Sequence, residues 1–93
     1  MGIKTQDKRK FKHAAHVSWR RVADEVVVLD LKTSAYFALN ESGALIWERL
    51  GAGASREDVV AAVYGEYEVS LNDASRHVDA LIQKLLKAKV LTS

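Results

Sequence analysis

Cysteine and proline are both absent from the 93 residues of this chain. Without cysteine the chain has no disulfide, no thiolate nucleophile and no cysteine-ligated zinc. This fits a reducing compartment, and we expect a cytoplasmic protein. Long apolar runs are also missing: the run at residues 26–29 falls far short of the about 20 residues that a membrane helix needs. The polar first twelve residues lack the apolar region of a secretory signal.

Motifs that carry catalysis are missing as well. The sequence contains no glycine-rich phosphate loop and no nucleophile elbow. His13 and His16 lie three residues apart, but two imidazoles make a poor metal site, because zinc usually takes three or four ligands. His77 is expected at the surface of a helix. We therefore expect a non-enzymatic chain without a metal or cofactor.

Positive charge is concentrated at the N-terminus. Residues 1–13 carry five basic side chains and one acid, and the rest of the chain carries nine basic and eleven acidic side chains. We expect a flexible basic tail at residues 1–14 and one folded domain at residues 15–93, since 93 residues suffice for a single small domain. A contact of the tail with nucleic acid or an acidic partner is the alternative interpretation.

Three segments of the first half have strand character. Residues 17–22 alternate apolar and polar side chains, with Val17 and Trp19 on one face. Residues 25–31 are rich in β-branched side chains, and residues 35–39 form a third short apolar segment. The connections are too short for crossovers, so we expect an antiparallel meander. Trp19 is placed either in the core or at its rim.

The second half has helical periodicity. Asn40 is a suitable N-cap for a helix that ends near residues 51–53, and Trp47 falls on its apolar face. Ser55 and Asp58 have the spacing of a capping box for a second helix. Ser70 repeats the capping signal before a third helix over about residues 71–88, after which we expect residues 90–91 to pack back onto the core. The fold class is α+β, with a three-stranded antiparallel sheet followed by three helices that cover one face of the sheet.

A longer pattern is present over residues 26–50. It contains a hydrophobic strand, an aspartate-containing turn, an aromatic strand that ends in Leu39-Asn40, and a helix that contains Ile46-Trp47. The chain resembles the PqqD-like family in this pattern, and the resemblance extends over about residues 17–92. One departure is Ser34, where the family often has glycine in the turn. The resemblance implies a winged-helix-like domain.

The resemblance also implies a function. Members of this family bind the leader segment of a ribosomally made precursor peptide without catalysing its modification. They present it to an enzyme such as a radical SAM enzyme, a protease or a cyclase, in pyrroloquinoline quinone, lasso peptide and related pathways. The leader adds as an extra strand at the edge of the third strand, in a groove beside the third helix.

Carried over to this sequence, the resemblance predicts a peptide-binding site on the third strand and on one flank of the third helix. Which face of the strand meets the groove is left open, and Ile82 and Leu86 have an alternative role in packing against residues 90–91. The predicted residues are Ala35, Tyr36, Phe37, Ala38, Leu39, Ser75, Asp79, Ile82, Gln83 and Leu86.

Two other interpretations are kept. Winged helices often bind DNA, but the second and third helices mix Arg and Lys with acids, which would neutralise phosphates poorly. An exposed strand edge can also pair with a copy of itself, which predicts a homodimer through that edge.

Overall fold

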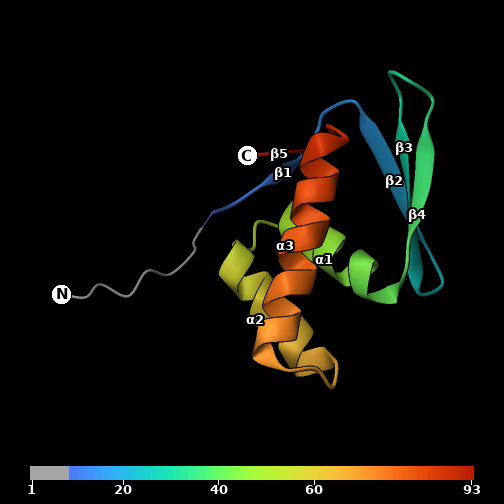
Figure 1. The fold of residues 1–93 in the computed structure, drawn as a ribbon. Coiled ribbons are helices and arrows are strands. Elements are labelled where there is room, and N and C mark those ends of the chain that lie inside the picture. The colour runs from blue at the N-terminus through green and yellow to red at the C-terminus, as the bar shows by residue number, and fades with distance from the viewer. Residues whose placement is uncertain (1–8) are drawn as a thin grey trace.

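Within residues 9–93, four strands precede the three helices along the chain and a fifth strand follows them. Figure 1 shows this arrangement in the computed structural model, which describes those residues. The elements are, in chain order, β1 (Lys12–His13), β2 (Val17–Val22), β3 (Glu25–Asp30), β4 (Tyr36–Leu39), α1 (Glu41–Gly51), α2 (Arg56–Glu66), α3 (Leu71–Lys87) and β5 (Leu91–Thr92). The main sheet is antiparallel with the order β2-β3-β4, and a separate two-stranded ladder joins β1 to β5. The predicted meander and the three helices that follow it are confirmed.

Each connection in the meander depends on one residue with a left-handed backbone. Ala23 has φ 55° between β2 and β3, and Ser34 has φ 65° between β3 and β4. In the second connection the Asp30 carboxylate accepts hydrogen bonds from the N–H groups of Lys32 and Thr33, at 2.8 and 3.2 Å. Desolvation raises the pKa of Asp30, but these hydrogen bonds outweigh it and the pKa lies below its ordinary value.

The predicted helix caps are all formed. The Asn40 side chain accepts a hydrogen bond at 3.0 Å from the N–H three residues further on. Ser55 and Asp58 form a complete capping box, in which each side chain bonds the other residue's N–H. Ser70 caps α3 in the same way as Asn40 caps α1. Each cap contributes about 1 kcal/mol, so the three helix starts are fixed by local chemistry.

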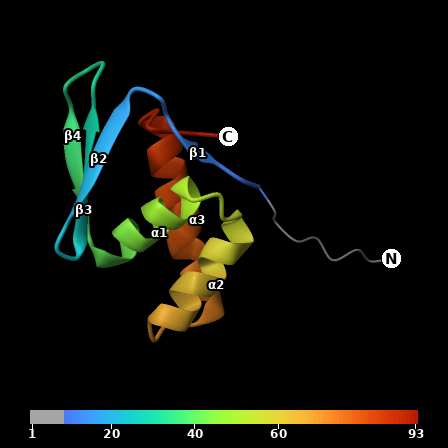
Figure 2. The same cartoon turned by 180° about the vertical axis from the view of Figure 1, so that it is seen from behind.

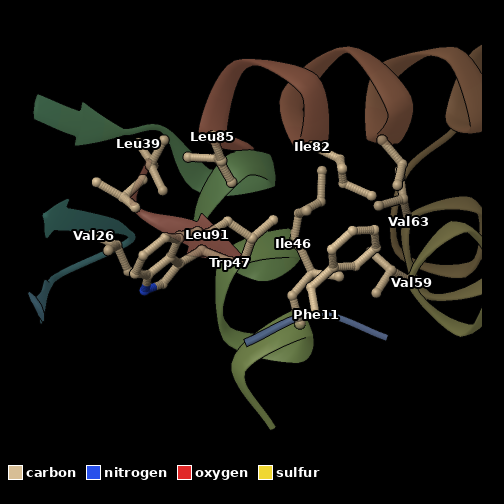
Figure 3. Packing of buried hydrophobic residues seen from close by; sticks show 14 of the residues in the cluster. Phe11, Val26, Leu39, Ile46, Trp47, Val59, Val63, Ile82, Leu85 and Leu91 are labelled. Carbon is tan, nitrogen blue, oxygen red and sulfur yellow. The ribbon is translucent and has the colours of Figure 1, made fainter. Parts of the chain in front are cut away.

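One side of the core joins the sheet to the helices. Val26, Val28 and Leu39 point from the sheet toward the helices, where Trp47 of α1 and Leu85 of α3 are also buried. Figure 3 shows Val26, Leu39, Trp47 and Leu85 together near β5. The helices therefore cover this inner face, and the alternate positions of the strands form an outer face.

The N-terminal segment differs from the predicted tail. Residues 1–8 lie outside the described part of the chain, but Phe11 and Ala14 are buried, with Phe11 only 4% exposed. β1 pairs with β5, and the Ala14 N–H donates to the Val90 carbonyl at 3.0 Å. The expected boundary between tail and domain at residue 14 is thus corrected, because the folded part already includes Phe11. The Phe11 ring is buried among the helices (Figure 3) and anchors this segment, although the charged side chains beside it point outward.

His13 extends this docking onto Trp47. Its imidazole stacks on the Trp47 ring at 3.7 Å between centroids, and its Nε2 lies 2.9 Å from the Trp47 carbonyl oxygen. Trp19 meets both rings edge-on and is 39% exposed, so it lies at the rim, whereas Trp47 is fully buried as predicted. Gly51 is required beneath the imidazole, because any side chain there would collide with it.

We predict that folding stability falls as the pH drops below about 6.5. Burial lowers the pKa of His13, although its hydrogen bond to Trp47 acts in the other direction. Because the unfolded chain then takes up the proton first, the stability present above the unfolded pKa of 6.5 is lost on acidification through the folded pKa. Thermal unfolding between pH 7.5 and 5.5 measures this. The slope should flatten in His13→Gln and persist in the control His77→Gln; equal slopes in all three proteins would contradict the assignment.

We predict that Ser34→Gly stabilises the domain by about 0.5–1 kcal/mol, because glycine adopts a positive φ without steric cost. Lys32→Gly in the same connection is the matched control and should destabilise, since Lys32 does not have a positive φ. Urea unfolding of the three proteins gives the comparison. Destabilisation by both glycines would show that the left-handed backbone of Ser34 carries no strain.

Candidate functional site

β4 lies at an edge of the sheet, since within residues 9–93 only β3 pairs with it. In an antiparallel sheet, successive residues direct their N–H and C=O groups alternately to the two sides of the strand. The Ala35 carbonyl accepts a hydrogen bond from β3 at 2.8 Å, which sets the alternation. Phe37 and Leu39 therefore bond to β3, and the N–H and C=O groups of Tyr36 and Ala38 point out of the sheet. This edge offers two donors and two acceptors to an incoming strand.

A groove separates this edge from α3. Its volume is about 320 Å³. Its surface is aliphatic and aromatic except for the ammonium group of Lys84. We refer to it as the β4–α3 groove, and it is lined by Phe37, Ala38, Leu39, Leu81, Lys84, Leu85 and Ala88.

Of the predicted strand residues, Phe37, Ala38 and Leu39 line this groove, and the strand register shows which side chains point to each face. Phe37 and Leu39 point inward toward the helices, because they share a face with the buried residues of β3. Tyr36, which is 73% exposed, and Ala38 point to the outer face. Ala35 precedes β4 and belongs to the connection with β3. The inner face of the strand therefore meets the groove.

The predicted flank of α3 does not lie beside β4. Asp79 pairs with Arg56 of α2 at 2.8 Å, and the same guanidinium donates to the Ser75 hydroxyl. Ile82 is 1% exposed and lies between the helices, next to Ile46 in Figure 3. This part of α3 faces α2, so its apolar side chains pack between the helices and do not line the groove.

The two remaining predicted positions also turn away from the groove. Gln83 is exposed and Leu86 is half-buried, and both line a separate shallow surface with Lys84 and Lys87. Leu86 packs against the core, which is the role that the sequence left as the alternative. The predicted α3 residues therefore lie outside the β4–α3 groove, which meets the other flank of the helix.

The groove residues that the sequence analysis missed are Leu81, Lys84 and Ala88. With Leu85 they have the spacing i, i+3, i+4 and i+7, which aligns them on one side of a helix. This spacing is a signal in the sequence. It competed with the equally apolar flank at Ile82 and Leu86, and only the packing of α2 distinguishes the two.

Other chemistry is limited in residues 9–93. No three His, Asp or Glu side chains of this range gather in a way that could hold a metal ion. No helix within it is long and apolar enough to cross a membrane. His77 is exposed, with its Nε2 2.9 Å from the Ser42 hydroxyl oxygen.

Known proteins resemble this chain in both sequence and structure. A family model described as coenzyme PQQ synthesis protein D (PqqD) matches residues 25–91. A solved structure described as TbiB1 in complex with the TbiA(beta) leader peptide is 32% identical, with a TM-score of 0.82, over 86% of this chain and 93% of that chain. A second, described as lasso peptide synthetase B1 complexed with the leader peptide, is 32% identical, with a TM-score of 0.84, over 91% of this chain and 100% of that chain. No curated protein matches.

We predict that amide hydrogen exchange alternates along β4. The N–H groups of Tyr36 and Ala38 should exchange more than about tenfold faster than those of Phe37 and Leu39, since only the latter pair are bonded to β3. Exchange of the ¹⁵N-labelled protein, followed by NMR, measures this. Equal protection at all four positions would show that the edge is already covered, for example by a second copy.

Proposed function

The chain belongs to the PqqD family, and we propose that it binds the leader segment of a ribosomally made precursor peptide by adding it as a strand to β4. The observation that carries the proposal is the open edge at Tyr36 and Ala38, which runs beside an apolar groove. Strand addition uses main-chain hydrogen bonds for affinity and side-chain pockets for specificity, and β4 with α3 supplies both. The leader peptides in the two similar solved structures support the same use of this chain.

The groove favours a particular kind of peptide. Alternate side chains of an added strand would point inward, between Phe37 and Leu81, so apolar residues are expected at every second position. Among the described residues that line the groove, Lys84 is the one that is charged, and it favours a carboxylate at the neighbouring position of the peptide. The expected ligand is an extended segment with spaced apolar residues and an acid.

We propose that the chain acts by binding alone and delivers the peptide to a modifying enzyme. Main-chain groups, apolar side chains and one lysine suit recognition better than bond making. The partner would be of the radical SAM, protease or cyclase type, in a pyrroloquinoline quinone, lasso peptide or related pathway. Because the ligand is made by ribosomes, the encounter is proposed in the cytoplasm.

The nucleic-acid interpretation gains nothing from the structure. Arg56 is paired with Asp79, and Arg76 with Asp73, both at 2.8 Å. These cations are compensated within the domain, whereas a phosphate-binding surface presents several uncompensated ones.

We predict that peptides selected on this protein depend on the β4 edge. A phage-displayed library of random peptides would be selected on the immobilised wild-type protein and, in parallel, on Ala38→Pro. Proline at this position removes an N–H that points to the open edge and is not needed by β3. Peptides with alternating apolar residues and an acid should be enriched on the wild type only, while circular dichroism shows that the variant keeps its fold.

The matched pair Leu81→Gln and Leu86→Gln then locates the groove. Both leucines are half-buried on α3, but only Leu81 lines the groove. In calorimetric titrations Leu81→Gln should weaken the selected peptide by about tenfold or more, and Leu86→Gln by less than about twofold. If Leu86→Gln weakened binding more than Leu81→Gln, the peptide would bind on the flank of α3 that carries Ile82. No enrichment over Ala38→Pro would reject the proposed function, and steeply salt-dependent DNA binding in its place would establish the nucleic-acid alternative.

A further inference from the structure

A second concavity lies where the first turns of α1 and α3 meet the end of α2. Its volume is about 510 Å³, compared with about 320 Å³ for the groove. Val63 and Ala74, both buried, belong to its lining, and Tyr67 and Val69 add further apolar surface. We call it the α1–α3 cleft, and its lining residues are Asn40, Glu41, Ser42, Val63, Tyr67, Val69, Asp73, Ala74 and His77.

The cleft and the β4–α3 groove both adjoin a third hollow. This hollow has a volume of about 290 Å³. It shares Leu39, Leu81 and Lys84 with the groove, and Asn40 and His77 with the cleft. An extended chain that follows β4 beyond Leu39 therefore reaches the cleft directly.

The direction of β4 decides which end of a bound peptide arrives there. β4 runs from Tyr36 to Leu39, toward the cleft, and every strand pair of the main sheet is antiparallel. Antiparallel pairing is the more stable arrangement, so an added strand is expected to run against β4. Residues on the N-terminal side of its paired segment then lie at the cleft, and its C-terminal side leaves past Tyr36.

The rim of the cleft is acidic. Glu41 has no ion-pair partner among residues 9–93, whereas Asp73 is paired with Arg76 at 2.8 Å. Tyr67 lies in the same field: burial raises the pKa of its phenol, and the charges of Glu41, Glu66 and Asp24 act in the same direction. Arg21, which pairs with Glu48, opposes them. Negative potential beside an apolar surface suits a ligand that is apolar and positively charged.

We propose that the α1–α3 cleft binds the N-terminal part of the leader peptide, with one large apolar side chain in the cleft and an adjacent lysine or arginine at Glu41. The inference rests on the proposed function, because the strand bound at β4 brings this part of the peptide to the cleft. It adds a second recognition site whose chemistry is opposite to that of the groove. The leader would then carry an acid at Lys84 and a base at Glu41, and this fixes its direction along β4.

Glu41 has a structural role that the test must separate from this one. It lies in the first turn of α1, where a carboxylate interacts favourably with the helix dipole. Glu57 has the same role in the first turn of α2 and does not line the cleft. Glu57→Lys is therefore the matched control for Glu41→Lys.

The experiment uses the peptide selected on the wild-type protein. It would be synthesised in full, without the residues N-terminal to the β-pairing segment, without the residues C-terminal to that segment, and in full with the N-terminal basic residue changed to glutamate. Each form would be titrated by calorimetry against the wild type, Glu41→Lys, Glu57→Lys and Val69→Asp. Val69 is 39% exposed in the lining of the cleft, so a charge there impairs the cleft without disturbing buried residues.

Removal of the N-terminal residues should weaken binding to the wild type by about tenfold or more, and hardly at all to Val69→Asp. The peptide with glutamate in place of its N-terminal basic residue should bind the wild type more weakly than the unchanged peptide does. It should regain affinity for Glu41→Lys but not for Glu57→Lys. Loss of a helix-dipole contact alone cannot produce this exchange of preference. Truncation without effect, or selected peptides without the apolar and basic pair, would overturn the cleft proposal and leave the groove proposal standing. A larger loss on truncation of the C-terminal side would overturn the direction. Absence of any β4-dependent peptide would reject both proposals.

Discussion

Burial of Val26, Val28 and Leu39 with Trp47 and Leu85 is the constraint on which the arrangement of the domain depends. These side chains fill the inner face of the sheet. β4 is therefore held by two contacts, the packing on its inner face and its hydrogen bonds to β3. The chain supplies no further strand to the main sheet within residues 9–93, so the outer edge of β4 stays open. Because β4 is already ordered in the free domain, little conformational entropy of the strand is lost when a peptide binds, and this favours tight strand addition. The strand spans only four residues, and such shortness limits unwanted pairing with other sheets.

Local chemistry explains why so much of the fold could be predicted. Each helix begins after a residue whose side chain accepts a hydrogen bond from a backbone N–H three residues further on, namely Asn40, Ser55 and Ser70. The helix starts can therefore be predicted from neighbouring residues alone. The strand limits agree within one residue for the same reason, since the alternation and the turns are also local. The N-terminal strand was missed because Phe11 stands alone among basic residues, and one aromatic side chain has no period that indicates burial.

The helix side of the site was beyond prediction for a different reason. α3 meets both α2 and the sheet, so apolar residues surround much of its circumference. Whether Leu81 or Leu86 faces the strand depends on how α2 packs against α3. That packing brings together residues far apart in the sequence, such as Arg56 and Asp79, which are 23 positions apart. The strand side needed only the register of one hairpin. Long-range packing therefore decides the half of the site that short-range patterns leave undetermined.

The ladder between β1 and β5 also has a consequence for how this domain can be combined with others. Lys12 lies opposite Thr92, so the chain enters and leaves the domain at neighbouring points. Figures 1 and 2 place these strands across α3 from β4. Two closely spaced connections on that side would allow the whole unit to be inserted into a loop of a larger protein with the open edge of β4 still exposed. The same architecture is thus compatible both with a domain that stands alone and with one that is inserted into a larger protein.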